Sequence, residues 1–421
     1  MKKGLYLDNA VKEKLNIIIP YYRKNKYRET GNEKWKQKKF YFDETLEVPV
    51  CSCTTYSKME NNKLRADEEV YVFALEKLGK RYTSDKSIEK RYERIIHQIY
   101  HAATYYDCKQ ISRIYQKNRK FLFSSYNTVI YEEYSFALLA ICRYYIEGIQ
   151  ISEYEFKMLD ELLCIYPVKL QELIKNLLFY YANVLTGKDI EYIYKKYDYA
   201  LSEFIPNKVC HVLELIYRQK KQSAIIEIQN LIPILIQQSN VNYLVVLYVY
   251  LANHVIYTDR ELCDTSLSKA FALLSEYDIP SKRKKSVLNN IASVELRLKN
   301  YAIAKRCIEN CIRLDNNTYT KRNISILCFC NHMMNEPMEA EWFTIVDPNA
   351  DHIDTLLYEY YHNLEKRSDK DNVAFILKEL TPYLTMYDSL YIFMLEQELM
   401  MLCESTRQFK SYYEFKRMFE S

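Results

Sequence analysis

The residues that could do chemistry in this sequence do not gather into a recognisable active site. His97 and His101 stand four residues apart on an expected helix, which is a metal-ligand spacing. No glutamate lies between them and no third ligand is in view, so we interpret them as a structural pair. The GxGxxG, GxxxxGK[ST], GxSxG and DxDxDG patterns are missing, and 5 glycines nearly exclude a phosphate-binding loop. We therefore expect no enzyme, no metal and no cofactor.

The cysteines point the same way. There are 12 of them, spread through apolar segments without a CxxC pair. Such cysteines usually behave as small buried hydrophobes in a reducing compartment. Cys307 and Cys311 share a helix face, and we assign them to packing rather than to a ligand pair. Because neither an N-terminal apolar region nor a run of about 18 apolar residues is present, we expect a cytoplasmic protein without a membrane partner.

The elements that would position any site are expected to be helices. The 421 residues include only 5 Gly and 9 Pro, too few turn residues for a strand-rich fold. From about residue 85 onward, apolar residues recur every three or four positions in segments of roughly 12 to 20 residues. Short polar breaks such as Tyr166-Pro167 and Ile205-Pro206-Asn207 separate them. This pattern predicts an all-α chain of antiparallel helical hairpins.

The charge is distributed unevenly. Residues 1–65 contain 15 Lys and Arg against 8 Asp and Glu, a balance of +7, whereas the whole chain carries +4. The remaining residues therefore sum to −3. A basic N-terminal segment on a neutral body is typical of a small nucleic-acid-binding head. The alternative is a solvated lysine-rich terminus.

A motif in this segment favours the head. Residues 50–63 read VCSCTTYSKMENNK and precede an amphipathic stretch, 68–78, that Gly79 stops. This order resembles the recognition helix and following helix of the lambda-repressor-like (Xre-type) helix-turn-helix. The resemblance implies that one group of polar residues faces base edges and a second group faces phosphates. The first group is Ser52, Thr54, Thr55 and Tyr56, and the second is Lys58, Asn61 and Lys63.

The head departs from that family in two places. The expected first helix, residues 10–24, contains Pro20, which removes a backbone hydrogen bond and is expected to kink the helix. No second helix is visible, and a lysine- and aromatic-rich stretch, residues 25–47, takes its place. We therefore describe the predicted domain as a degenerate helix-turn-helix.

One hairpin carries a repeat signature. Residues 290–315 resemble one tetratricopeptide (TPR) unit of about 34 residues, with Ala292 and Ala304 as the small residues where two helices cross and Tyr301 at the turn. We expect about seven hairpins between residue 127 and the end. Stacked hairpins of this kind predict a right-handed superhelix whose first helices line a concave face.

The predicted domains are thus a helix-turn-helix over residues 1–82, linker helices over 83–126 and a TPR-like repeat domain over 127–421. Together they resemble the Rgg and PlcR type of peptide-sensing transcription factors of Gram-positive bacteria. This resemblance implies a homodimer that binds double-stranded DNA and holds a short peptide in each repeat domain.

Five asparagines each fall in an expected first helix: Asn183, Asn253, Asn290, Asn331 and Asn363. The last four are separated by 37, 41 and 32 residues, about one repeat each. A carboxamide offers a donor and an acceptor, as an extended peptide requires, so we expect these residues to bind a peptide or protein segment. The alternative is that they tie neighbouring helices together. For the whole chain, the alternative to a DNA-binding regulator is a protein-interaction scaffold whose head no longer binds DNA.

Overall fold

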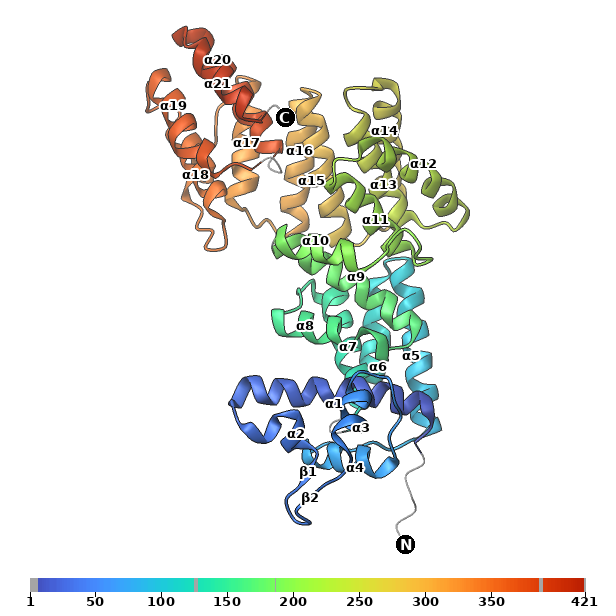
Figure 1. Ribbon diagram of the computed structural model, residues 1–421. Helices are drawn as coiled ribbons and strands as arrows, with labels where there is room; N and C mark the ends of the chain where they lie inside the picture. Colours follow the sequence, from blue (N-terminus) through green and yellow to red (C-terminus); the bar gives the residue numbers. More distant parts are fainter. Residues whose placement is uncertain (1–6, 125–127, 186, 386–388, 420–421) are drawn as a thin grey trace. The chain divides into compact units, whose positions relative to one another are not determined.

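The computed structural model describes residues 7–124, 128–185, 187–385 and 389–419, and the side chains of residues 183–189 lie outside the described part. Within these ranges the chain forms 21 α-helices, short 3-10 and π segments, and one two-stranded hairpin (Figure 1). The expected all-α fold is therefore confirmed. No helix in the described part is both long and apolar enough to cross a membrane.

The chain divides into two compact units, Met1–Ala224 and Ile225–Ser421. The predicted head, the predicted linker helices and the first predicted repeats all belong to the first unit. The helix α12 (Lys221–Gln237) contains the boundary.

The first part of unit 1 is built on one long helix. α1 (Asn9–Thr30) begins at Asp8, whose side chain accepts a hydrogen bond from the Val11 amide, and ends where Gly31 adopts a left-handed conformation. Pro20 lies inside α1 on its buried face, and the helix continues for ten further residues. A short turn, η1 (Glu33–Trp35), and one helical turn, α2 (Gln37–Phe40), follow. The stretch without a visible second helix therefore folds into a very short one.

A hairpin and two helices complete this part of the unit. Strands β1 (Phe42–Asp43) and β2 (Val48–Pro49) pair antiparallel, with Phe42 opposite Pro49. α3 (Cys53–Glu60) and α4 (Glu68–Lys77) then occupy the segments that resemble a recognition helix and its successor. α1 packs against both α3 and α4.

Helical hairpins form the rest of unit 1. Their helices are α5 (Lys86–Thr104), α6 (Cys108–Phe123), α7 (Tyr131–Glu147), α8 (Glu153–Glu161), α9 (Val168–Leu185), α10 (Gly187–Lys196) and α11 (Ile205–Tyr217). α5 packs against α6, α7, α9 and α11, so the segment expected to be a linker is itself a packed hairpin. The apolar stripe Ile95, Ile96 and Ile99 of α5 is buried, as the 3.6-residue period predicts.

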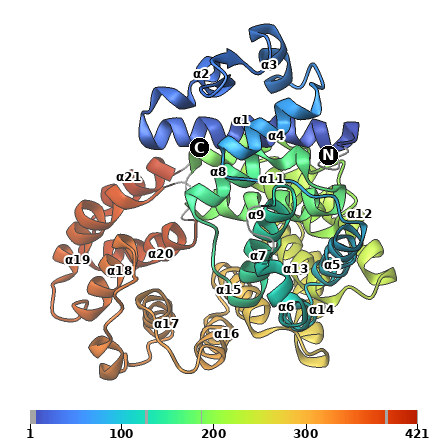
Figure 2. The ribbon, with the colours of Figure 1, turned by 90° about the horizontal axis from the view of Figure 1, so that it is seen from below.

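Unit 2 continues the hairpin pattern. Its further helices are α13 (Val241–Val255), α14 (Arg260–Glu276), α15 (Ser281–Arg297), α16 (Tyr301–Leu314), α17 (Lys321–Met333), α18 (His352–His362), α19 (Asp369–Phe375), α20 (Ser389–Thr406) and α21 (Phe409–Phe419). They follow one another along a curve in Figure 2. In the hairpin of α15 and α16, Ala292 and Ala304 are at most 1% exposed, which suits their expected place at the helix crossing.

One hairpin of unit 2 lacks its second helix. The segment after α17, residues 334–351, contains only the short η3 (Ala340–Thr344). This loop carries the chain back to the start of α17, where Lys321 Nζ lies 3.3 Å from Thr355 Oγ1 of α18. α18 therefore runs in the same direction as α17, as successive first helices of a repeat stack do. The Asn331-to-Asn363 spacing is close to one repeat because this loop has about the length of a helix.

Candidate nucleic-acid interface and effector face

The inner side of α3 is fixed by a buried ion pair. Arg23 on α1 donates from Nε and Nη2 to the two carboxylate oxygens of Glu60, with both distances 2.8 Å. Both side chains are less than 10% exposed. Arg23 also donates to the Trp35 carbonyl at 2.8 Å, and Gln37 donates to Glu60 at 2.7 Å. This network holds α1, η1 and α2 to the end of α3.

A second polar contact fixes the turn between α3 and α4. Asn16, fully buried on α1, donates to Asn62 Oδ1 at 3.1 Å and to the Leu64 carbonyl at 3.0 Å. Its own carbonyl oxygen accepts from the Tyr71 hydroxyl at 2.8 Å. Asn62 has a positive φ of 54°, which asparagine tolerates better than most residues. The orientation of α3 is therefore set by polar groups that α1 supplies from within its apolar face.

The outer side of α3 carries most of the predicted contact residues. Ser52 caps the helix, because its hydroxyl accepts from the Thr55 amide at 3.1 Å. Ser52 and Thr54 are exposed and Thr55 is half-buried. The expectation for Tyr56 is wrong: its ring is 5% exposed and stacks on Tyr41 at 5.1 Å between centroids. A stacked ring inside the core cannot reach a base edge.

The residues expected at phosphates are also exposed. These are Lys58, Asn61 and Lys63. The Asn61 amide donates to the Ser57 carbonyl at 2.7 Å and so helps to end α3. In the described part of the chain neither Lys58 nor Lys63 has an ion pair or a hydrogen bond from its side chain. Both charges are available to an anion.

The hairpin before α3 was not expected. Its exposed turn includes Glu44, Leu46 and Glu47, and Leu46 is 68% exposed. Asp43 folds the turn by accepting from the amides of Thr45 and Leu46. The turn thus places acidic side chains close in sequence to α3, which carries Lys58 and Glu60.

The five asparagines do not behave alike. The Asn183 side chain lies outside the described residues. Asn331 is 3% exposed and donates to the Pro337 carbonyl at 2.7 Å, so it holds the loop after α17. Asn363 donates to Glu359 and accepts from Lys366 at the end of α18. Asn331 and Asn363 therefore fit the alternative, in which the side chain stabilises local structure.

Asn253 and Asn290 remain on a shared face of α13 and α15. Asn290 is exposed, and no side-chain hydrogen bond engages it in the described part. Asn253 accepts from Arg297 at 2.7 Å, and Arg297 also donates to Ser389 at 2.8 Å. Asn290 and Arg297 are seven residues apart on α15, so they lie on the same side of that helix. We call Asn253, Asn290 and Arg297 the effector face.

Arg297 is the residue that the sequence reading missed. No described carboxylate forms an ion pair with it, and burial lowers the pKa of its guanidinium. A cation that is partly withdrawn from water without a counter-ion favours an anionic or carbonyl ligand. Its place seven residues after Asn290 is the signal that could have identified it.

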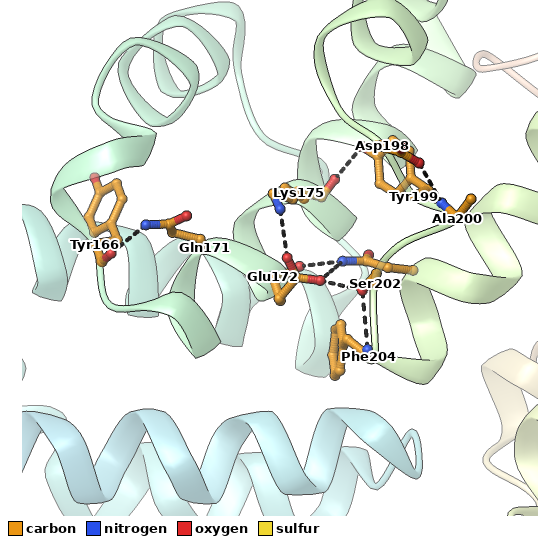
Figure 3. Close-up of polar contacts among 10 residues, drawn as sticks. Tyr166, Gln171, Glu172, Lys175, Asp198, Tyr199, Ala200, Ser202 and Phe204 are labelled. Carbon is orange, nitrogen blue, oxygen red and sulfur yellow. Dashed lines mark hydrogen bonds and ion pairs between the residues drawn. The ribbon is translucent and has the colours of Figure 1, made fainter.

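A polar cluster in unit 1 is structural. Glu172 on α9 accepts from Lys175 at 2.6 Å, from Asn207 at 3.0 Å and from the Ser202 hydroxyl (Figure 3). Burial would raise the pKa of Glu172, but the hydrogen bonds from Lys175, Ser202 and Asn207 lower it overall. Ser202 is buried and also accepts from the Phe204 amide. The cluster fixes the segment between α10 and α11 on α9.

The histidine pair and the two cysteines of α16 lie in surroundings without a described metal-ligand cluster. No group of three or more metal-ligating side chains occurs among the described residues. His97 lies 2.6 Å from the Lys169 ammonium. Burial raises the pKa of Cys307 to about 12 and of Cys311 to about 11, so both thiols stay protonated at neutral pH. This suits the packing role expected for the two thiols.

No protein-family model matches the sequence, and no curated protein is significantly similar to it.

Proposed function

We propose that the chain is a DNA-binding regulator that reads duplex DNA with α3 and responds to a peptide or other effector bound at the effector face of unit 2. The observation that carries this proposal is the two-sidedness of α3. Its inner side is fixed by the Arg23–Glu60 ion pair, its outer side presents Ser52, Thr54 and Lys58 to solvent, and Lys63 is exposed in the turn that follows. A rigid helix whose Thr54 hydroxyl and Lys58 ammonium have no hydrogen-bond partner among the described residues suits the major groove of DNA.

The division of labour on α3 follows from side-chain chemistry. Ser52 and Thr54 lie in the first turn, where short hydroxyl side chains can donate to or accept from base edges. Lys58 lies in the last turn and Lys63 in the turn that follows the helix, where a flexible ammonium can pair with the phosphate backbone. We thus assign recognition of the base sequence to Ser52 and Thr54, and sequence-independent affinity for the phosphate backbone to Lys58 and Lys63.

The proposal can be tested by selection from a pool of random duplexes. The full chain is expected to enrich a defined site, and Thr54→Ala is expected to relax the preference at one position. Lys58→Gln with Lys63→Gln should weaken binding to all sequences about equally. The matched control, Lys220→Gln with Lys221→Gln, removes two exposed charges outside α3 and should change nothing. Failure of the wild-type chain to enrich any sequence contradicts the proposal.

The effector part has its own test. A synthetic peptide pool is screened against the full chain, and the peptides retained are titrated against variants. Asn290→Ala and Arg297→Met should each weaken binding about tenfold, the effect of losing one hydrogen bond to a charged group. Asn363→Ala is the control, because that amide serves its own helix end. Equal affinity for all of these variants removes the effector face from the proposal.

A scaffold without DNA binding is the second candidate. It is favoured by the hairpin turn before α3, where acidic side chains flank the exposed Leu46. Acidic groups repel phosphates, whereas an exposed leucine rimmed by charge suits a protein partner. If duplex binding is absent at low salt while Leu46→Asp abolishes a protein complex, the scaffold is the better account.

A further inference from the structure

The hairpin of α5 and α6 is as basic as the N-terminal segment. Residues 86–123 contain 9 Lys and Arg against 3 Asp and Glu, in a chain whose net charge is +4. The sequence reading placed the basic excess in residues 1–65, because the acidic residues elsewhere in 66–421 cancelled this local charge. The proposed reader helix uses none of these residues.

The charge converges on a cleft. A cavity of about 360 Å³ opens between α5 and α6 and is lined by four cationic side chains together with Ser87 and the Asn118 amide. The cations are Lys90, Arg91, Arg94 and Lys117. None of the described residues that line the cleft carries a carboxylate. Its size falls at the lower end of the range for small-molecule sites, about 300 to 1,000 Å³.

The Arg91 side chain is held in position by neutral groups. Its Nη2 donates to Asn118 Oδ1 at 3.3 Å, and its guanidinium carbon lies 4.1 Å from the centroid of the Phe121 ring. Asn118 is itself 7% exposed and donates to the Ile114 carbonyl at 2.9 Å. Two neutral groups therefore orient the guanidinium, and its charge is not neutralised by either.

The other three cations lack counter-ions as well. In the described part of the chain Lys90, Arg94 and Lys117 are exposed and have no ion pair. Of the acidic residues near the cleft, Asp85 caps α5, Glu89 accepts from the Tyr131 hydroxyl, and Glu93 lines a different pocket together with Lys14 and Tyr134.

We propose that this cleft binds an oligophosphate, either inorganic or the phosphate chain of a nucleotide. Several charges converging within one small cavity match an anion that carries two or three phosphate groups close together. A duplex backbone instead presents its phosphates in a spaced row. The guanidinium and ammonium groups would here donate hydrogen bonds to the phosphate oxygens, as backbone amides do in glycine-rich loops. The cleft shares no residue with the proposed reader helix or with the effector face.

The test measures binding of sodium tripolyphosphate, ATP and a 20-base-pair duplex to the full chain by isothermal titration calorimetry at low salt. The cleft variant is Arg94→Gln with Lys117→Gln. Its charge-matched control is Arg113→Gln with Lys120→Gln, both on α6 but outside the cleft lining. Lys90→Gln serves as a second cleft variant, and circular dichroism confirms that each variant is folded.

Tripolyphosphate is expected to bind with one site per chain. The cleft variant should weaken it at least tenfold, about 1.4 kcal/mol, and the control less than threefold. Tighter binding of ATP than of tripolyphosphate identifies a nucleotide as the ligand class, and equal affinity identifies the phosphate chain alone. The proposal is overturned if the cleft and control variants lose equal affinity for tripolyphosphate. It is also overturned if the cleft substitutions weaken binding of the duplex alone.

Discussion

The buried pair of Arg23 and Glu60 gives the most quantitative prediction. Each residue is to be replaced by methionine, alone and together, to form a double-mutant cycle. Among the described residues, Glu60→Met leaves the guanidinium of Arg23 buried with the Trp35 carbonyl, and Arg23→Met leaves the carboxylate of Glu60 with the neutral Gln37 amide and no cation. A buried charge without its partner typically costs about 3–5 kcal/mol.

The double variant is expected to lose less unfolding free energy than the sum of the losses of the two single variants. Two methionines fill a similar volume and leave no unpaired charge, so the pair can cost little or even stabilise. The expected coupling energy is therefore several kcal/mol, well beyond the roughly 0.5 kcal/mol within which independent sites add. The cycle reports the interaction rather than the two truncations.

Trp35 offers a local probe for this experiment. It is 7% exposed and accepts from Arg23, and the chain has only 2 tryptophans. In a Trp342→Phe background, urea unfolding followed by fluorescence thus reports on the surroundings of α1 and α3. Glu33→Gln, which breaks the exposed pair with Lys36, should leave the midpoint unchanged. Single variants that lose less than about 1 kcal/mol, or strictly additive losses, refute the reasoning.

Three further predictions concern pH and packing. The hydrogen bond with Glu398 raises the pKa of His332 despite burial, so the stability that this bond contributes is present below about pH 6.5 and lost as the pH rises. Calorimetry should show an unfolding temperature that falls with rising pH in the wild-type chain and falls less in His332→Gln. The same dependence of the unfolding temperature on pH in both proteins contradicts this. The pKa of Glu172 is lowered, so Glu172→Gln should destabilise the chain at pH 7 and progressively less below about pH 4.3; a difference independent of pH contradicts this. Tyr56→Ala should cost about 3–5 kcal/mol while Thr54→Ala leaves the urea midpoint unchanged, and similar midpoints for both would show that Tyr56 is not core.

The sequence was most informative where periodic apolar residues settle the structure locally. The helices of the α15–α16 hairpin and of the α3–α4 pair lie close to where the apolar period and the breaks place them. A helix of 14 to 17 residues repeats its apolar face several times, so chance coincidences average out. Capping residues such as Ser52 sharpen the boundaries.

The sequence was least informative where contacts between distant residues decide the structure. In the sequence Arg23 looks like one more cationic residue of a basic segment, and only the fold brings Glu60 to it across 37 positions. Tyr56 reads as an exposed polar aromatic until Tyr41 is seen stacked on it. Pro20 would break an isolated helix, but here it lies in the buried face of α1, where tertiary packing outweighs propensity.

Two features of the structure could not be recognised from summed charge or from residue spacing. The basic cleft disappeared because charge was summed over residues 66–421. The regular asparagine spacing suggested one common role, whereas a loop without a second helix separates Asn331 from Asn363. Equal spacing in a sequence reports equal chain length, which helices and loops can fill in different ways.

The salt dependence of duplex binding tests the central claim about α3 most directly. The logarithm of the dissociation constant is plotted against the logarithm of salt concentration for the full chain and for Lys58→Gln with Lys63→Gln. Each phosphate contact contributes about 0.9 to the slope, so the variant is expected to lose nearly 2 units, while the Lys220→Gln, Lys221→Gln control loses none. The same slope for all three proteins, or no binding at the lowest salt, would contradict α3 as the DNA-reading helix.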